Sequence, residues 1–367
     1  MQNAFVVSFY DKNMVFLNDL PDVKTSPISF QESTNGGQKD ITIECSYKFE
    51  ERPDFINEGN YVRITQLNND YAPKGRLVYS GYIEGLDPYI KGGNQGLTIT
   101  IMGLVGLLQR SFFKDAGALS RSYVTTDPSI VIADVLSSYQ VDYPSSGNDF
   151  IGSDALSVEG LLIRVGNQIS STGKSIGFDF DKINHFDAIK KCLELTGEDW
   201  FWKVDAGGDF IFKAKPVSAT HSFTVGKDIQ DISPRRSISE VVNKVYAEYD
   251  SGLTSDSDSV SVNDFGLSED IINESTADLD AADELVAQKL SSSKDKKSFA
   301  KITINNQYDT FSIKPGDTCE VLNIVKNNDM FNDNMFIKSV TYEENLCHLT
   351  LEDEPLEITK VLKNATR

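Results

Sequence analysis

The last third of the chain combines strand and helix patterns in the order that says most about its fold. A strand pattern at Val241–Tyr249 precedes a Ser- and Asp-rich stretch at 251–261 and a helical pattern near 275–289. Short strand patterns then surround the tight turn Ile313-Lys314-Pro315-Gly316-Asp317, at 300–304, 318–324, 335–342 and 346–353. We therefore expect a small antiparallel β-barrel that carries one helix, with 251–261 as a surface loop.

The first 110 residues show a similar pattern. Ile41, Ile43 and Cys45 alternate with polar residues, which is the period of two of a half-buried strand. Strands separated by Gly, Pro and Asn clusters are predicted at 4–10, 14–16, 40–49, 61–67, 77–86 and 96–102. The two ends of the chain thus favour strand-rich blocks of similar size, and an internal duplication is one interpretation of them.

The block at 111–216 has a different pattern. Asp127-Pro128 is typical of a helix start, and Asn184 should cap a second helix that Gly197 ends. Two strands, 200–204 and 209–213, follow around a Gly-containing turn. This block is therefore expected to be a mixed helix-plus-hairpin region.

The charge of the chain limits its possible partners. Lys and Arg number 35 against 55 Asp and Glu, which gives a formal net charge of −20 at pH 7. Because affinity for DNA comes mainly from cations that neutralise phosphates, static DNA binding is not expected. The acidic excess suits either solubility or a surface past which nucleic acid slides without adhering.

Membrane insertion, secretion and disulfide bonding are not indicated. The longest apolar run, Leu97–Leu108, is shorter than the roughly 20 residues of a membrane helix. The N-terminus lacks a basic segment followed by a long apolar stretch, so we expect no signal peptide. The cysteines are scattered without a CxxC pair and are expected to be buried thiols: Cys45, Cys192, Cys319 and Cys347.

Most candidate chemical motifs have incomplete spacing. His185, His221 and His348 show no metal-ligand spacing, so ordinary core or surface roles are expected. Gly173-Lys174-Ser175 resembles the end of a phosphate-binding loop, but Gln168 stands where that motif needs glycine. The GxSxG nucleophile motif is absent. We therefore assign no catalytic, cofactor-binding or metal-binding residues.

Two weaker candidates involve carboxylates. Glu198-Asp199 beside Trp200 and Trp202 could serve a glycan hydrolase, and the two tryptophans alone could bind carbohydrate. The preferred interpretation is that Glu198 and Asp199 form a turn and that the tryptophans share one strand face and pack on the helix. The acidic residues Asp256, Asp258 and Asp264 lack the Gly and Glu positions of an EF-hand.

Four stretches stand in an order that one family shares. They are Val78–Glu84 with Leu97–Leu104, Phe186–Gly197 with its hairpin, Val242–Tyr246, and Ile313–Asp317 with Phe336–Tyr342 and Leu346–Leu351. In this order the chain resembles bacteriophage tail-tip or baseplate hub proteins, in pattern more than in invariant motif. The resemblance spans nearly the whole chain.

This resemblance implies a homotrimer that presents six barrels to a hexameric tail tube. It implies a structural virion protein of the phage tail tip that is not an enzyme and is assembled in the host cytoplasm. Expected partners are a tail tube or distal tail protein and a tip, spike or fibre protein, while DNA passes through without specific binding. A carbohydrate-binding adhesion module and a glycan hydrolase are the alternatives.

The predicted fold class is mostly β (α+β). Two antiparallel, tube-like β-barrel domains are expected at 1–110 and 217–367, the second with an internal helix near 275–290. The mixed helix-plus-hairpin region at 111–216 lies between them in the sequence.

Overall fold

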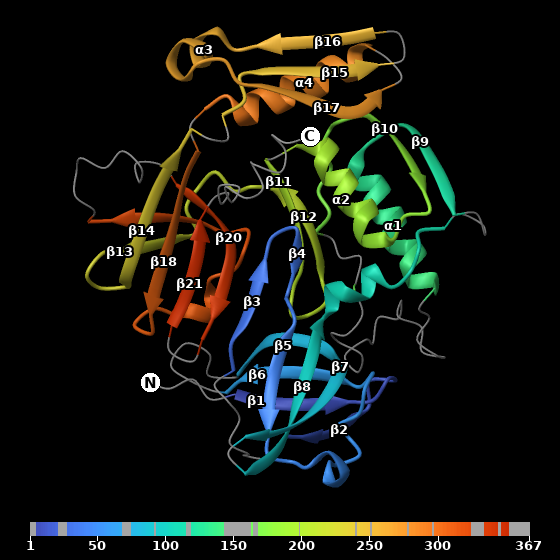
Figure 1. Ribbon diagram of the computed structural model, residues 1–367, viewed down its shortest axis with the longest axis vertical. Coiled ribbons are helices and arrows are strands. Elements are labelled where there is room, and N and C mark those ends of the chain that lie inside the picture. Colours follow the sequence, from blue (N-terminus) through green and yellow to red (C-terminus); the bar gives the residue numbers. More distant parts are fainter. Residues whose placement is uncertain are drawn as a thin grey trace.

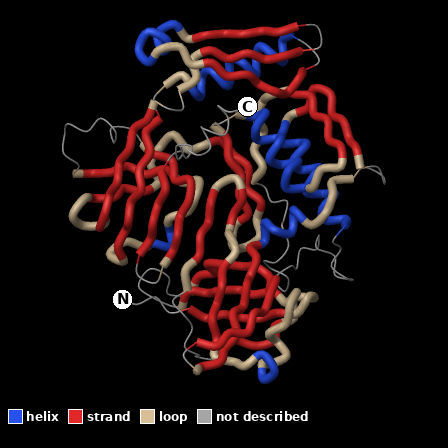
Figure 2. The backbone as a smooth tube through the Cα atoms, viewed as in Figure 1, coloured by secondary structure: helices blue, strands red, loops and turns tan. Residues whose placement is uncertain are grey.

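A computed structural model gives a mostly β protein with a few helices (Figures 1 and 2). It describes residues 5–20, 28–67, 75–91, 93–114, 119–142, 163, 168–197, 199–238, 241–249, 252–276, 279–295, 297–323, 334–343 and 346–351. Among these residues no helix is long and apolar enough to cross a membrane. The predicted mostly β fold class is confirmed.

The N-terminal sheet is a curled antiparallel sheet of six strands (lower part of Figure 1). Its spatial order is β2-β1-β6-β7-β8-β5. The strands are β1 Phe5–Tyr10, β2 Phe16–Asp19, β5 Ile41–Cys45, β6 Tyr61–Gln66, β7 Arg76–Lys91 and β8 Asn94–Gly103. One face is apolar because alternate residues such as Ile41, Ile43 and Cys45 point inward, as their period of two predicts.

The C-terminal sheet has seven strands in the order β13-β19-β20-β21-β18-β14, with β3 paired to β20. The strands are β3 Phe30–Ser33, β13 His221–Thr224, β14 Ile229–Ser237, β18 Lys297–Asn305, β19 Thr318–Leu322, β20 Met335–Tyr342 and β21 Leu346–Leu351. β3 comes from the N-terminal block, yet it pairs with β20 and its Phe30 ring packs against that of Tyr342, with ring centroids 4.8 Å apart. The two sheets consequently share one hydrophobic core.

Four consecutive strands repeat the same topology in both sheets. β6, β7 and β8 form a meander beside which β5 returns, and β19, β20 and β21 do the same with β18. This is the Greek-key arrangement, and all of its pairings are antiparallel in both copies. A short 3₁₀ helix also follows the first strand in each: η1 Phe49–Glu51 and η4 Thr310–Ser312.

The register of the two copies agrees residue by residue. Ile41 opposes Ile101 and Cys45 opposes Leu97, just as Ala300 opposes Leu351 and Ile304 opposes Cys347. A β-bulge interrupts β7 between Ile83 and Gly85, and β20 has its bulge between Ile337 and Ser339. Because a bulge is a local departure from regular pairing, a shared position indicates a shared backbone plan.

The turn before the second strand of each Greek key is also the same. Gly59 donates its N–H to Ile83 O and Ile83 donates to Asn60 O, at 2.8 Å each. The corresponding bonds run from Gly316 to Ile337 O at 2.8 Å and from Ile337 to Asp317 O at 2.9 Å. Both glycines have positive φ, 84° and 91°. The duplication suggested by the sequence pattern is thus present in the backbone hydrogen bonds of the two sheets.

The middle of the chain forms a layer with its own core (centre and right of Figure 1). Its elements are β9 Ser120–Thr126, α1 Pro128–Asp142, β10 Ile176–Asp181, α2 His185–Thr196, β11 Trp200–Val204 and β12 Phe210–Ala214. The Asn184 side chain accepts a hydrogen bond from Asp187 N, and Gly197 follows α2 with φ 104°, as predicted. β4, Gly36–Gly37, pairs with β11 and ties this layer to the N-terminal block.

Residues 244–293 form a third unit, at the top of Figure 1. β16 Gly252–Ser257, β15 Lys244–Tyr249 and β17 Glu269–Thr276 make a three-stranded sheet, with α3 Ser259–Phe265 and α4 Leu279–Ser293. α4 packs on the sheet through Val286 and Leu290 against Val245. The unit is inserted between β14 and β18.

Two expectations for this region are wrong. The strand at 241–249 and the helix do not join the C-terminal sheet, because β15 hydrogen-bonds only to β16 and β17 among the described strands. The stretch 251–261 is not a loop but contains β16 and the start of α3. Its polar side chains fit an exposed edge strand, and Asp258 caps α3 by accepting a hydrogen bond from Ser261 N at 2.9 Å. The division at residues 110 and 216 stays a prediction.

Candidate functional site

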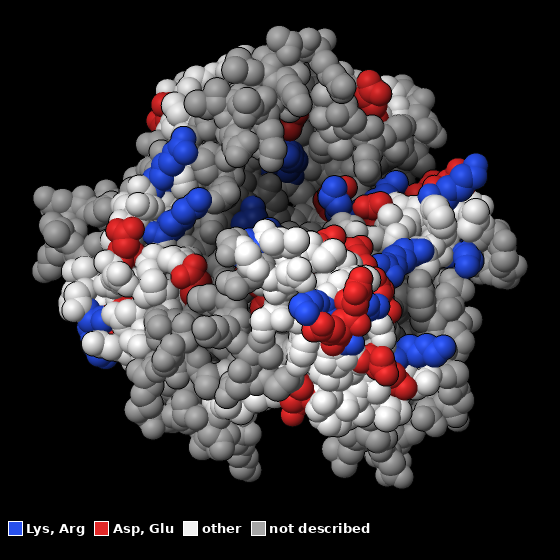
Figure 3. All heavy atoms as spheres, turned by 60° about the horizontal axis from the view of Figure 1, so that its bottom comes forward, with Lys and Arg blue, Asp and Glu red and all other residues white. Residues whose placement is uncertain are grey.

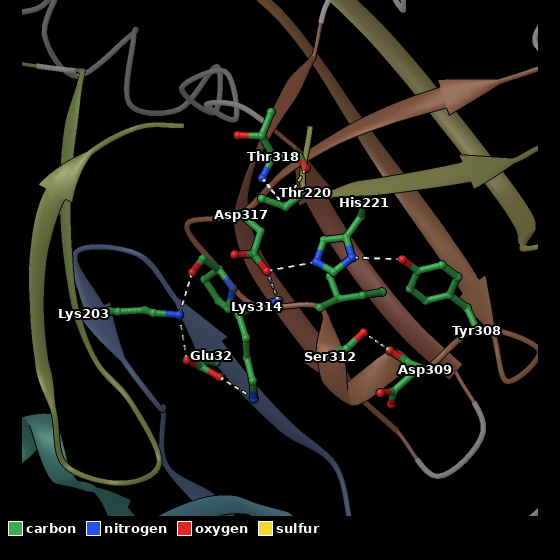
Figure 4. A network of polar contacts seen from close by, with 12 residues as sticks. Glu32, Lys203, Thr220, His221, Tyr308, Asp309, Ser312, Lys314, Asp317 and Thr318 are labelled. Atoms are coloured by element: carbon green, nitrogen blue, oxygen red, sulfur yellow. Dashed lines mark hydrogen bonds and ion pairs between the residues drawn. The ribbon is translucent and has the colours of Figure 1, made fainter. Parts of the chain in front are cut away.

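A buried network of charges joins the N-terminal block, the middle layer and the C-terminal sheet (Figure 4). At its centre lies Glu32 of β3, whose side chain is 1% exposed. Its carboxylate lies 3.5 Å from Lys203 Nζ of β11 and 3.6 Å from Lys314 Nζ in the turn before β19. Three segments far apart in the sequence therefore meet around one carboxylate.

Lys203 holds the turn directly. Its ammonium donates a hydrogen bond of 2.7 Å to the carbonyl oxygen of Pro315. Burial lowers the pKa of Lys203, and the nearby Glu32 carboxylate opposes that shift. A buried ammonium of this kind needs its carboxylate partner, because an unpaired buried charge is costly.

The same turn is held from its other side by His221 of β13. The His221 ring nitrogens lie 3.0 Å from Asp317 Oδ2 and 3.0 Å from the Tyr308 hydroxyl. Asp317 Oδ2 also accepts the Lys314 backbone N–H at 2.9 Å. Burial favours the neutral acid, but hydrogen bonds from His221 and Lys314 outweigh it and lower the pKa of Asp317. This arrangement fixes the Gly316 turn, which is the C-terminal equivalent of the Gly59 turn in the N-terminal sheet.

Tyr308, His221 and Asp317 line up like a proton relay, but the group at its end is a poor nucleophile. Burial raises the pKa of Tyr308 first of all, and nearby carboxylates raise it further. A phenol with a raised pKa is not activated for attack. The network is better suited to hold three segments rigidly than to perform a reaction.

The other two histidines lie apart from this network. His185 Nδ1 lies 2.9 Å from Ser111 Oγ, and the ring packs near Phe113 and Tyr139. His348 lies on β21, 3.1 Å from Thr303 Oγ1. Among the described residues, no group of three His, Cys, Asp or Glu side chains could hold a metal ion.

The tryptophan pair is part of the middle core. Trp202 is fully buried, stacks on Phe210 at 5.4 Å and meets Phe186 of α2 edge-on at 5.5 Å. Trp200 is half-buried and stacks on Phe212 at 5.0 Å. The predicted packing on the helix is confirmed, and Trp202 offers no face to a sugar.

The described carboxylates that the sequence offered as candidates lie in structural positions. Asp199 is exposed, and its backbone oxygen accepts the Lys215 N–H at 2.7 Å, at the base of the hairpin. Glu198 lies outside the described residues. Likewise Asp258 caps α3 and pairs with Lys294 at 2.8 Å, and Asp256 lies on the exposed strand β16.

The loop that leads into Gly173-Lys174-Ser175 binds a carboxylate of the protein itself, that of Asp127. Thr172 N and Gly173 N donate to Asp127 Oδ2 at 3.1 and 3.0 Å, and Ser171 Oγ donates at 2.7 Å. The same side chain caps α1 through Ser129 N at 2.8 Å. Lys174 Nζ donates to Thr196 O at 2.6 Å, at the end of α2. The amides that a phosphate would need are therefore used to close the loop on α1.

Replacing Asp127 should destabilise this layer. Burial opposes its charge, but hydrogen bonds from Ser171, Ser129 and Thr172 prevail and hold its pKa well below its usual value. We expect Asp127→Ala to cost about 2 kcal/mol at pH 7, the upper range for a helix cap. Thermal unfolding at pH 7 measures this loss.

The charge can be tested with Asp127→Asn, which keeps a capping oxygen. A carboxyl with a lowered pKa stabilises the folded state above the unfolded pKa of about 3.9, and this contribution is lost as pH falls below that value. The gap in melting temperature between wild type and Asp127→Asn should therefore shrink from pH 7 to pH 3. A gap that is constant over this range would contradict the role of the charge.

Sequence reasoning did not identify Glu32, Lys203 or Lys314 as a group. Glu32 belongs to β3, which the sequence patterns do not predict, and Lys203 is a single lysine in the otherwise apolar strand Trp200–Val204, with no pattern that pairs it with a carboxylate. The only available signal was the Ile313–Asp317 turn, which was predicted and is confirmed by the Asp317 N to Lys314 O bond of 3.1 Å.

The chain is similar to known proteins in structure but not in sequence. No protein-family model matches the chain, and no curated protein is similar to it in sequence. The fold is similar to the 43 kDa tail protein of prophage MuSo2 from Shewanella oneidensis, with TM-score 0.61 and 12% identity over 96% of this chain and 97% of that one. It is also similar to the tail protein from Neisseria meningitidis, with TM-score 0.63 and 9% identity over 96% and 97% of the two chains.

A third solved structure agrees. Prophage tail protein gp18 from Listeria monocytogenes gives TM-score 0.57 at 10% identity, over 98% of both chains. Each match covers nearly the whole length, so the sheets, the middle layer and the inserted unit all take part in the likeness. The chain has the fold of phage tail proteins.

Proposed function

We propose that the protein is a structural component of a phage tail, a hub at the tail tip or baseplate, and not an enzyme. The observation that carries this proposal is the duplicated Greek key, with the same bulge and the same glycine turn in both sheets. The likeness to prophage tail proteins supports it. In this proposal residues 1–110 and 217–367 contain the two tube-like barrel domains, the second interrupted by the inserted unit at 244–293, and 111–216 is the mixed region between them.

The duplication supports assembly into a ring. The two barrels of one chain contact each other through different surfaces, since β3 leaves the N-terminal block to pair with β20 of the C-terminal sheet. Arg76 of β7 and Asp309 beside η4 add an ion pair of 2.8 Å across this contact. When two similar barrels contact each other head to tail, each barrel is left with one contact surface that has no partner. Further copies can bind at these surfaces, which favours a closed ring. Three chains would give six barrels, matching a hexameric tail tube.

The acidic charge suits a channel for DNA. A wall that neutralises few phosphates cannot retain the genome by counterion release. On the face shown in Figure 3, acidic and basic side chains are intermixed. The N-terminal block also carries the ion pairs Lys48–Glu51 and Lys91–Glu44. Among the described residues drawn in Figure 3, the basic side chains form no continuous track for the phosphate backbone.

The proposed partners follow from this position in the tail. A tail tube or distal tail protein would lie on one side of the ring, and a tip, spike or fibre protein on the other. DNA would pass without specific binding, and the protein would be assembled in the host cytoplasm and located in the virion.

The oligomeric state tests this proposal. We expect light scattering during size-exclusion chromatography to give about three times the 40.7 kDa mass of one chain. Cryo-electron microscopy of the purified assembly should show a ring with six similar lobes. A chain that stays monomeric from micromolar to near-millimolar concentration, and that also stays monomeric with its tube protein, would overturn the proposal.

A further inference from the structure

The backbone edge of β20 is extended by a strand from elsewhere in the chain. β19 and the Asp317 turn cover β20 as far as Ile337. Immediately beyond the turn, Lys338 O accepts the Thr34 N–H at 2.9 Å, and β3 then pairs with residues 339–342. The bulge at this point thus marks where one neighbouring strand ends and another begins.

The N-terminal sheet repeats this edge without the added strand. β6 and the Asn60 turn cover β7 as far as Ile83. Aligning Ile83 with Ile337 makes Glu84–Pro88 equivalent to Lys338–Tyr342. From Glu84 onward β7 pairs with β8 alone among the described strands, and Glu84, Asp87 and Pro88 are exposed.

The direction of the free backbone groups follows from the shared register. Lys338 presents its carbonyl away from β21, so Glu84 presents its carbonyl away from β8. In an antiparallel strand every second residue points its N–H and C=O to the same side. Leu86 therefore offers both groups at the open edge, and Pro88 offers a carbonyl only. These groups can pair with a short added strand. The pairing should end near Pro88, because proline has no N–H to donate.

We propose that the edge of β7 from Glu84 to Pro88 pairs with an extended segment of a second copy of this chain. The inference rests on the proposed ring, because the same edge in the C-terminal sheet joins the two barrels within the chain. In a ring of alternating barrels, the edge of each N-terminal sheet faces the next chain. Pairing at a free strand edge is a recurrent mode of association.

The second junction differs from the first in its charges. The turn residue equivalent to Lys314 is Asn57, because Asn60 N donates to Asn57 O just as Asp317 N donates to Lys314 O. The incoming strand therefore needs no buried carboxylate like Glu32. This difference keeps β3 of one chain from being an equally good partner for the β7 edge of another.

A substitution at Gly85 can block the proposed edge without disturbing the fold of the single chain. A Cβ at Gly85 would meet no atom within 4 Å, so Gly85→Arg places a bulky side chain beside the open edge without a clash inside the chain. We expect its association constant to fall at least tenfold by sedimentation equilibrium, with the monomer's melting temperature unchanged. Gly177→Arg is the control, because Gly177 is an exposed position of β10 and an added Cβ there would lie 3.7 Å from its nearest neighbour, the Tyr123 carbonyl oxygen.

Hydrogen exchange provides a second measurement without a substitution. Peptides that cover Glu84–Tyr89 should exchange at least tenfold more slowly in the wild-type assembly than in diluted monomer. Wild-type trimers with an unprotected edge, and Gly85→Arg trimers of normal affinity, would overturn this inference and leave the proposed ring intact. A wild-type chain that never self-associates would instead overturn the ring. If only a tube protein protects the edge, the second copy is the wrong occupant.

Discussion

Replacing Glu32 by Gln is expected to lower the free energy of unfolding by about 3–5 kcal/mol, the cost of leaving one partner of a buried ion pair without the other. The substitution keeps the shape of the side chain but removes the charge that faces Lys203 at 3.5 Å. Lys203 would then keep its hydrogen bond to the Pro315 carbonyl but lose the carboxylate that neutralises its buried charge. Equilibrium unfolding in denaturant, followed by tryptophan fluorescence, measures the loss because Trp200 and Trp202 lie on the same strand, β11, as Lys203.

The double variant Glu32→Gln, Lys203→Met separates charge from packing. Replacing both members of a buried pair by groups of similar volume is often neutral. We therefore expect the double variant to lie within about 1 kcal/mol of wild type. The Glu32→Gln penalty should also decrease at high pH, because burial lowers the pKa of Lys203 and its neutral form needs no carboxylate. A single variant that is as stable as wild type would show that Glu32 does not hold the three segments together.

Gly316→Ala should be among the most damaging single-methyl additions in the chain. Gly316 has φ 91°, and a Cβ there would lie 2.3 Å from Cε2 of Phe201, whose ring is 1% exposed. The left-handed backbone costs about 1–2 kcal/mol for alanine. Overpacking a buried ring adds about 1–3 kcal/mol. The expected loss of unfolding free energy is therefore about 2–5 kcal/mol, measured by denaturant titration.

The duplication supplies a matched control for that variant. Gly59 makes the same turn with φ 84°, and a Cβ there would meet nothing within 4 Å. Gly59→Ala should cost only the backbone term of about 1–2 kcal/mol. Equal losses for both variants would mean that Phe201 moves aside and that the junction between β11 and the turn is loosely packed.

Local signals predicted the helices of the middle layer well. α2 begins and ends where Asn184 and Gly197 placed it, because a cap is a contact between near neighbours in sequence. α4 was expected at 275–289 but occupies Leu279–Ser293. The difference arises because β17 continues to Thr276 and pairs with β15. A strand partner is a tertiary contact and shifts a helix start that propensity alone cannot fix.

The sequence indicates where most strands lie better than it indicates which strands pair with one another. β3 was not predicted at all, since four residues with one aromatic carry little signal, and its partner β20 lies in the last third of the chain. β16 was mistaken for a loop because its six residues are nearly all exposed. An edge strand that faces solvent can contain Ser and Asp. A Ser- and Asp-rich stretch therefore indicates contact with solvent, but it does not indicate that a strand is absent.

The amino-acid sequence by itself determined the strand-rich ends, the capped helices, the Pro-Gly turn and the lack of a complete catalytic motif, because each depends on residues a few positions apart. Only the tertiary structure decided that the two ends share one hydrogen-bond plan and that Glu32, Lys203 and Lys314 meet. Pairing register and buried ion pairs depend on segments far apart in the chain. Their energies arise when the core closes around them, so no local pattern records them.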